Sequence, residues 1–367
     1  MRIISLLFTC ALVVIGCYVP LFAQTDCKGP TQYVSPCYET VKLSESVYAF
    51  IAPESPSPVV TGNSVLVIGR DSALVFDSGH FPSVTRRLIA EIRRLTTKPV
   101  RYLVVSHWHP DHNAGNGLFQ EAFPGIAIVS TTYTRQQWEK QVIKNADPKL
   151  YAGTVEAIDK MLAAGKYLDG SPLNDVRRKY LVDAKAEFQW MLPEVEQAKH
   201  TAPNLIFEKT LSVDLGGKVA SIMFPGRGNT GGDAVVYVPD DKLLVTGDLL
   251  VYPSPYAIGS YPTDWIQTLR ELNKIDASFI VPGHGRVQHD KSYITQIASL
   301  LESMNKQVAM AAQRGKTLEQ TRASVQFDDF LRTLPTDPAW KLAFQEFFVR
   351  PGVERAYKEA KEGKLID

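Results

Sequence analysis

The chain has 367 residues, of which 45% are hydrophobic and 22% are charged. These proportions are typical of a globular protein and exclude a collagen-like, coiled-coil or wholly disordered chain. Lys and Arg number 40 and Asp and Glu number 39, so the formal net charge is +1. A nucleic-acid-binding protein normally carries a basic excess or a basic stripe, and this sequence has neither. We therefore expect a small-molecule substrate and no nucleic-acid partner.

Residues 1–23 have the layout of a secretory signal peptide. Arg2 precedes an almost entirely apolar run from Ile3 to Phe22, and Ala23 offers a small residue for cleavage. Two alternatives are a transmembrane anchor, since the run is about long enough to span a bilayer, and a lipoprotein with the lipid on Cys17. The sequence thus predicts an exported protein, periplasmic or secreted, whose membrane contact is limited to the signal peptide or a lipid anchor at Cys17.

Cysteine usage agrees with export. Cleavage after Ala23 leaves two cysteines, Cys27 and Cys37, ten residues apart in turn-rich sequence. This spacing predicts one disulfide that closes a short loop. Metal binding by two free thiols is the weaker alternative, because no further Cys or His stands nearby. Residues 24–46 are expected to form an N-terminal extension that the disulfide ties down.

From Val47 onward, short apolar runs alternate with turn residues. Strands are predicted at residues 47–51, 64–68, 73–76, 100–105, 126–129, 205–207, 219–224, 234–238, 243–246 and 279–281. The apolar spacing within residues 83–95 predicts an amphipathic helix, and a short helix is expected at 264–274. Residues 134–200 predict a mostly helical insertion, and residues 291–367 a C-terminal helical extension. Two blocks of alternating strands and helices predict a layered α/β fold.

The strongest chemical signal is the run His107-Trp108-His109-Pro110-Asp111-His112, directly after a predicted strand. Three imidazoles and a carboxylate this close together are costly to bury without a partner. Alternate residues of the loop point the same way, so His107 and His109 can share one ion while Asp111 and His112 turn toward a second. Imidazole and carboxylate ligands without a thiolate are typical of catalytic zinc, with iron or manganese as alternatives.

Two later segments add ligands to this run. Asp248 comes just after a predicted strand, where its carboxylate can bridge two metal ions. His284 stands between two glycines after another predicted strand, where it is free to approach an ion closely. Either residue alone would be typical of an ordinary turn. After the histidine-rich run, both favour a metal site.

In these residues the chain resembles the metallo-beta-lactamase superfamily. The resemblance covers about residues 47–290 and rests on residues that stand in the family's order: His107, His109, Asp111, His112, the Gly232-Asp233 stretch, Asp248 and His284. It implies an αββα sandwich, with the helical insertion and the C-terminal helices as additions. It further implies that His107 and His109 bind one metal together with a third histidine. Asp111, His112 and His284 would bind the second metal, Asp248 would bridge the two, and Asp77 would brace the site.

One residue departs from the family pattern. The third histidine of the first metal site usually lies in a Gly-x-x-His-Thr-x-Gly-Asp run, and in this chain Asn229 takes its place within residues 226–233. An amide oxygen is a weaker zinc ligand than imidazole, so the first site is expected to be loosened. The second site keeps all its ligands. The remaining histidines, His80, His200 and His289, fall outside the pattern and are expected to lie at the surface or to support the ligands.

The expected chemistry is metal-assisted hydrolysis of an ester, thioester, lactone or amide. Zinc lowers the pKa of a bound water toward neutrality. Asp111 is expected to orient the nucleophile, and either Asp111 or a metal-bound water would protonate the leaving group. The sequence contains no GxSxG motif, which agrees with water as the nucleophile. Two other readings stay open: a non-catalytic binding protein with a degenerate metal site, and a di-iron redox protein of the same fold.

The aromatic residues between positions 252 and 265 are ambiguous. Tyr256, Tyr261 and Trp265 follow closely after Asp248 and, with the helical insertion, are candidates for the walls of a substrate pocket. They are equally typical of core packing.

Overall fold

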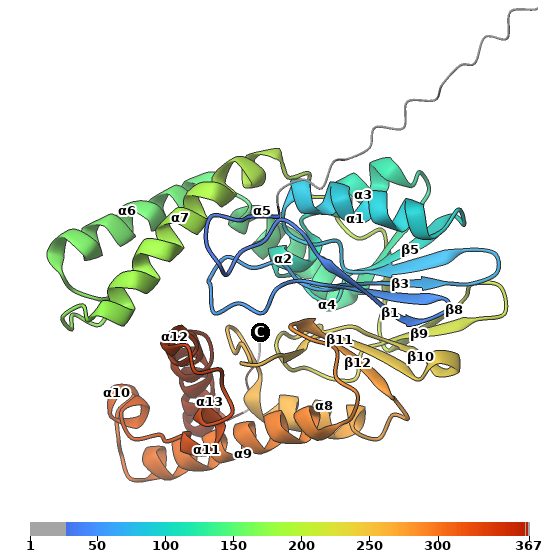
Figure 1. Ribbon diagram of the computed structural model, residues 1–367. Helices are drawn as coiled ribbons and strands as arrows, with labels where there is room; N and C mark the ends of the chain where they lie inside the picture. The colour runs from blue at the N-terminus through green and yellow to red at the C-terminus, as the bar shows by residue number, and fades with distance from the viewer. Residues whose placement is uncertain (1–26, 364, 366–367) are drawn as a thin grey trace, which may run out of the picture.

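Two β-sheets pack face to face in the computed structural model, which describes residues 27–363 and residue 365, and helices cover the outer face of each sheet (Figure 1). This is the αββα sandwich that the sequence predicted. The predicted signal peptide and Cys17 lie outside the described residues. None of the helices in the described part of the chain is long and apolar enough to cross a bilayer.

The first sheet has seven strands in chain order, from β1 at one edge to β7 at the other. Its strands are β1 (Glu39–Ser44), β2 (Val47–Ile51), β3 (Ser64–Ile68), β4 (Ala73–Phe76), β5 (Val100–Val104), β6 (Ala127–Thr131) and β7 (Leu205–Phe207). The pairs from β1 to β4 are antiparallel, and those from β4 to β7 are parallel. The carboxyl ends of β4, β5 and β6 therefore lie along one edge of the sheet.

The second sheet has five strands in the order β12-β11-β10-β9-β8. Its strands are β8 (Thr210–Asp214), β9 (Val219–Met223), β10 (Val235–Val238), β11 (Leu243–Val251) and β12 (Phe279–His284), and a 3-10 turn (Pro239–Asp241) joins β10 to β11. Only β11 and β12 pair in parallel. Both of these strands therefore end at the same edge.

The hydrophobic core has three layers, one between the sheets and one outside each sheet. Val65, Leu74 and Ile222 belong to the buried cluster between the sheets. Helices α1 (Pro82–Leu95) and α3 (Asn116–Ala122) cover the outer face of the first sheet. Helices α8 (Pro262–Leu272) and α9 (Ser292–Gln313) cover the second sheet. These layers fix the strand ends in space and leave their connecting loops free to carry a site.

The insertion between β6 and β7 is helical, as expected. It contains α4 (Thr132–Gln137), a π-helical turn (Trp138–Val142), α5 (Ile143–Asn145), α6 (Pro148–Ala164) and α7 (Asp175–Gln197). Helix α6 begins with Pro148 in its first turn behind an Asp147 cap, and it ends at Gly165, whose φ of 64° is left-handed. Proline at the start and glycine at the end are the usual boundaries of a helix.

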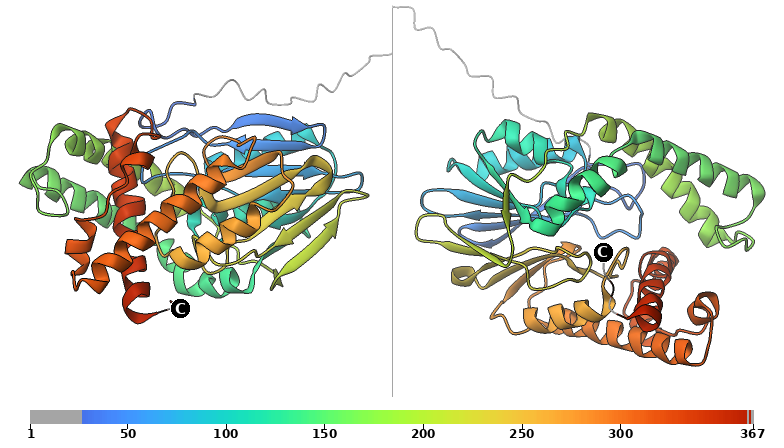
Figure 2. Two further views of the ribbon diagram at one scale, coloured as in Figure 1. Left: turned by 90° about the horizontal axis from the view of Figure 1, so that it is seen from below. Right: turned by 180° about the vertical axis from the view of Figure 1, so that it is seen from behind.

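The C-terminal extension is also helical. Its elements after α9 are α10 (Leu318–Arg322), α11 (Asp328–Leu331), α12 (Pro338–Phe344), a π-helical turn (Gln345–Val349) and α13 (Arg350–Glu362). Leu342 of α12 packs against Ile158 and Leu181 of the α6–α7 hairpin. The hairpin and the C-terminal helices thus meet at one end of the sandwich, as both views of Figure 2 show.

Several strands differ from the sequence prediction, among them β12, which continues to His284 instead of ending at residue 281. β1 and β8 were not predicted, because both are edge strands whose side chains are mostly polar and exposed or half-buried. β1 lies in the stretch that was expected to be an extension, and it pairs with β2. β11 continues to Val251 instead of ending at residue 246. The pairing with β12 shifts register at Gly247, whose φ is 52°, and then continues. The predicted disulfide between Cys27 and Cys37 is present.

Candidate metal centre

Six of the seven predicted ligands come from the segment after β5, from β11 and from the end of β12. His107 lies just after β5, and His109 caps α2 (Pro110–Asn113), which carries Asp111 and His112. Asp248 lies within β11, and His284 is the last residue of the adjacent parallel strand β12. The carboxyl ends of parallel strands are the usual place for ligands in open α/β sheets.

The structure brings six of the seven predicted ligands together in two groups that share Asp248. One group holds Asp111, His112, Asp248 and His284, and the other holds His107, His109 and Asp248. Within each group the donor atoms lie within 4.8 Å of one another. The Nε2 atoms of His112 and His284 are 3.2 Å apart, and Asp111 Oδ2 is 3.0 Å from His284 Nε2. Such converging donors can hold a metal ion.

Asp77 braces the ligand loop from below. Its backbone is left-handed, with a φ of 56°, which is uncommon for a residue other than glycine and is typical of functional sites. The carboxylate accepts hydrogen bonds from Ser106 N and Ser106 Oγ, each at 2.7 Å, and lies 2.7 Å from His112 Nδ1. This contact makes Nδ1 the protonated nitrogen of His112 and turns Nε2 toward the cluster.

The cluster carries more negative than positive charge. Asp77, Asp111 and Asp248 are buried or nearly buried, and their ion-pair partners among the described residues are all histidines. Burial lowers the pKa of His107 well below its ordinary value, with further lowering by His112 and His109, so this imidazole is neutral. Burial opposes ionisation of Asp111 as well, but His112 and His284 outweigh it and hold the pKa of that carboxyl well below its usual range. Three buried carboxylates beside imidazoles, of which His107 is neutral, fit a divalent cation.

Asn229, the seventh predicted ligand, is fully buried in the loop between β9 and β10. Its Nδ2 donates a hydrogen bond of 2.9 Å to the carbonyl of Tyr256, whose ring lies 5.7 Å from the ring of His284. Its Oδ1 has no hydrogen-bond partner among the described residues. A buried amide oxygen without a partner is costly, and a cation would satisfy it. Asp233 shapes this loop through bonds from Thr230 N and Oγ1.

The loop before β3 joins the ligand loop after β5 to the end of β12, a feature that sequence reasoning missed. Gly62 N donates to the carbonyl of Asp111 (2.9 Å), and Asn63 N donates to that of Gly283 (2.7 Å). Both glycines lie where a side chain would collide: a Cβ on Gly62 would come within 2.4 Å of the His112 ring, and one on Gly283 within 2.0 Å of Asp248 Oδ1. The Gly-Asn pair before a strand was the available signal.

A cavity of about 230 Å³ opens above the cluster. Asp111, whose side chain is 14% exposed, lines it together with the more deeply buried Asp248. Trp108, Tyr256 and Phe347 are aromatic residues that face the same cavity. Of the ambiguous aromatic residues, Tyr256 is thus a wall of the cavity, whereas Tyr261 and Trp265 are buried in the core.

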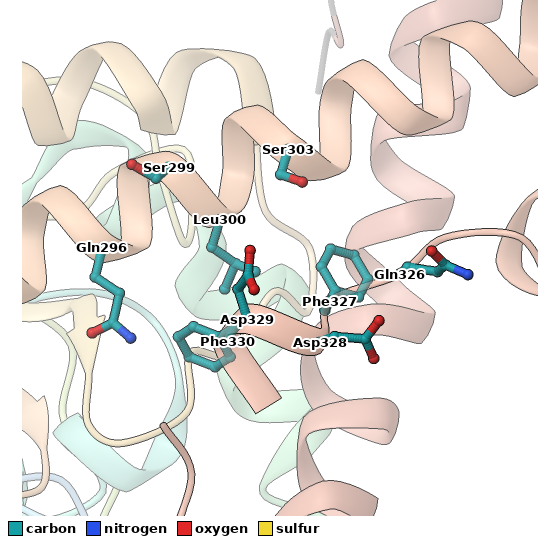
Figure 3. Close-up of a pocket in the computed structure, with 9 residues that line it drawn as sticks. All are labelled: Gln296, Ser299, Leu300, Ser303, Gln326, Phe327, Asp328, Asp329 and Phe330. Atoms are coloured by element: carbon teal, nitrogen blue, oxygen red, sulfur yellow. The ribbon is translucent and has the colours of Figure 1, made fainter. Parts of the chain in front are cut away.

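The other histidines lie outside the cluster. His80 is buried, with Nδ1 2.8 Å from the carbonyl of Val60, and His289 is exposed. A separate cavity of about 260 Å³ lies between α9 and α11, where Ser299, Ser303 and Asp329 surround Leu300 and Phe330 (Figure 3). It has no histidine or cysteine among its described lining residues. The metal-ligating side chains therefore single out the cavity at the strand ends.

Comparison with known proteins agrees with this geometry. Residues 57–284 match the metallo-beta-lactamase superfamily. The chain belongs to this superfamily. The match includes all seven predicted ligands and the helical insertion, and it excludes the helices after β12. At the level of the superfamily this supports a metal-dependent hydrolase, and the two ligand groups form a possible metal-binding cluster within the matched residues.

The relatives within the superfamily are distant. A linear primary-alkylsulfatase from a Pseudomonas strain is 23% identical over 62% of this chain, and the match spans 42% of the alkylsulfatase. A type 2 metallo-beta-lactamase from Elizabethkingia meningoseptica is 20% identical over 59% of this chain and 89% of the lactamase. Among solved structures, a metallo-beta-lactamase from Pontibacter korlensis has a TM-score of 0.52 and 20% identity, covering 72% of this chain and 99% of its own. At this identity the structural likeness shows the fold.

Replacement of Asp77 by Asn tests whether it orients a metal ligand. Asp77→Asn keeps the shape of the side chain but weakens the acceptor that holds His112 Nδ1. We expect zinc affinity to fall by about 10- to 100-fold, the usual cost of losing a partner that orients a ligating histidine. Competition with a chromophoric chelator measures this directly. Unchanged affinity in a variant with a native circular dichroism spectrum would contradict the role given to Asp77.

His200 makes stability sensitive to acid. Neither ring nitrogen has a hydrogen-bond partner among the described residues, and burial, with a smaller effect of His80, lowers its pKa from 6.5 to about 4. His200 takes up a proton more readily in the unfolded chain than in the folded one. The free energy of unfolding is therefore unaffected by His200 above about pH 6.5 and decreases as the pH falls from 6.5 toward 4. When the pH falls from 7 to 4.5, we expect the free energy of unfolding to decrease by roughly 2 kcal/mol less in His200→Phe than in the natural protein. Urea unfolding at the two pH values measures this difference.

The matched control is His289→Phe, because His289 is exposed. This variant should follow the natural protein at both pH values. If both variants show the same dependence on pH as the natural protein, burial of His200 does not govern the response to acid.

Proposed function

We propose that this protein is an exported hydrolase that uses one or two divalent cations and water to cleave an ester, thioester, lactone or amide. The observation that supports it most is the position of Asp111: it belongs to the buried ligand cluster and also lines the cavity above that cluster. A substrate in the cavity would therefore lie against the same residues that hold the metal.

Two sets of side chains would hold the cations. His107, His109 and Asp248, with the free Oδ1 of Asn229, would form the first site. The second site would consist of Asp111, His112, Asp248 and His284. Imidazole and carboxylate donors favour zinc, with iron or manganese as alternatives. When bound, such a cation supplies Lewis acidity, which makes water a nucleophile near neutral pH and polarises the substrate's carbonyl group.

Asp111 would orient the attacking water and pass a proton to the leaving group. It is the more exposed of the two carboxylates that line the cavity, and its Oδ2 faces His112 and His284. His284 and His112 hold its pKa low, so Asp111 is ionised and ready to accept a hydrogen bond from water. General acid–base catalysis needs the acceptor within hydrogen-bonding reach of the proton it takes.

The complete second site favours catalysis over the reading of a degenerate binding protein. All four donors of that group are present and close together, so the substitution at Asn229 affects one site and leaves the other intact. The disulfide between Cys27 and Cys37 supports export, because disulfides persist in oxidising compartments. The expected partner is a small-molecule substrate.

Replacement of Asp111 tests the hydrolytic role. Asp111→Ala removes both a metal donor and the group that orients water, so we expect kcat/KM to fall by about 100-fold or more on any ester or lactam that the natural protein cleaves. The control is Asp159→Ala, which removes an exposed carboxylate from α6 that pairs with Lys185. An Asp111→Ala variant that kept more than half of the natural rate would exclude this mechanism.

Asn229 is expected to set the metal content. With a neutral oxygen in place of an imidazole, the first site should bind zinc more weakly than the second, which gives between one and two ions per chain at limiting zinc. Asn229→His should raise the affinity of the first site, and Asn229→Leu, which has no donor, should lower it. Calorimetric zinc titration measures both. Two equally tight sites in all three proteins would show that position 229 does not govern metal binding.

A further inference from the structure

The walls of the cavity above the metal centre come from five separate parts of the chain, one of which is the helical insertion, through Asn145 of α5. Pro58 and Val60 lie in the loop after β2, Trp108 lies in the ligand loop, and Ile258 follows β11. Phe347 comes from the π-helical turn between α12 and α13, beyond the end of the superfamily match at residue 284. The C-terminal extension thus reaches the site and completes one of its walls.

Phe347 is held in place by the residues around Tyr256. Its carbonyl accepts a hydrogen bond of 2.7 Å from Ala257 N, and its ring lies 5.4 Å from the ring of Tyr256 at an interplanar angle of 70°. The neighbouring Phe344 and Phe348 are buried in the core under α9, whereas Phe347 is only partly buried and faces the cavity. A π-helical turn of this kind is rare and is frequent at functional sites. Phe347 is therefore a rigidly placed apolar wall.

The charged side chains of the cavity all lie on its floor, by which we mean the part formed by the ligand cluster. The ionisable residues that line it are His109, Asp111 and Asp248, which belong to the ligand cluster. None of the described residues that line it is Lys or Arg, and its remaining polar side chains, such as Asn145 and Tyr256, are neutral. Protein sites for sulfate or phosphate groups normally supply Arg or Lys to the charged oxygens. The walls therefore suit a substrate that carries no anionic group.

We infer that the cavity takes the short apolar acyl group of an uncharged ester, lactone or amide, and that Phe347 limits the size of that group. The inference rests on the proposed hydrolytic function and names the substrate class for the same site. The volume of about 230 Å³ is below the 300–1,000 Å³ of pockets for drug-sized ligands, so a short group fits. An apolar acyl group would pack against the aromatic wall that Trp108, Tyr256 and Phe347 form.

The test uses the zinc-loaded protein and p-nitrophenyl compounds that share one leaving group. We expect hydrolysis of the acetate and butyrate esters, and a kcat/KM at least about 100-fold lower for p-nitrophenyl sulfate and phosphate, because no Lys or Arg among the described lining residues pairs with their charged oxygens. In Phe347→Ala the ratio of kcat/KM for the octanoate ester to that for the acetate ester should rise by roughly 10-fold, mainly through KM. The reason is that removal of the ring leaves room for a longer acyl chain. In Ile258→Trp, a change at a half-exposed wall position, the preference should move toward the acetate.

The matched control is Phe123→Ala, because Phe123 is a partly buried phenylalanine outside the cavity. Its chain-length preference should equal that of the natural protein. If zinc-loaded natural protein cleaves no ester, thioester, lactone or amide, the proposed function and this inference both fail. If it cleaves esters but prefers the sulfate, or if both wall variants keep the natural preference, the inference fails while the hydrolytic function stands.

Discussion

The pairing of buried carboxylates with imidazoles at the edge of the sandwich is the interaction on which the site depends. His112 lies 2.7 Å from Asp77, 3.2 Å from Asp111 and 3.1 Å from Asp248, all in a part of the structure that is buried or nearly so. Burial alone would lower the pKa of this histidine, but the three carboxylates outweigh burial and raise that pKa well above its ordinary value. Buried negative charge of this kind is tolerated only where cations or metal ions neutralise it. The fold must therefore hold the turn after β4, the loop after β5 and the strands β11 and β12 in register. The backbone bonds of Gly62 to Asp111 and of Asn63 to Gly283 contribute to this.

The regular core of the fold was predictable because it follows from local pattern. The runs at 47–51, 64–68 and 73–76 are strands with those same bounds, since each is a short apolar segment between turn residues. The edge strands β1 and β8 were not predictable in this way. Their stability comes from backbone pairing with β2 and β9, and their polar side chains carry no apolar pattern.

The candidate site was partly predictable for a different reason. His107, His109, Asp111 and His112 are close in sequence, so their shared chemistry is visible in one run. Asp248 and His284 were found by their positions after strands and by the order of residues in the family. Tyr256 and the helical insertion were candidates for the walls of a pocket, and Tyr256 and Asn145 of that insertion line the cavity. Phe347 carries no comparable signal, because only the packing of the C-terminal extension brings it to the cavity. Sequence thus points to the floor of the site and to part of its walls, whereas the wall at Phe347 depends on tertiary packing.

Asn229 connects the floor with those walls. An asparagine side chain offers a donor and an acceptor on one short amide. The donor is used by the carbonyl of Tyr256, and Tyr256 contacts both His284 and Phe347. The acceptor has no partner among the described residues, and Asn229 stands where the family resemblance predicts a metal-binding histidine. We propose that Asn229 both weakens the first metal site and fixes the backbone of the aromatic wall. A change at Asn229 should for this reason alter substrate preference together with metal content, whereas a change at Phe347 should alter preference alone.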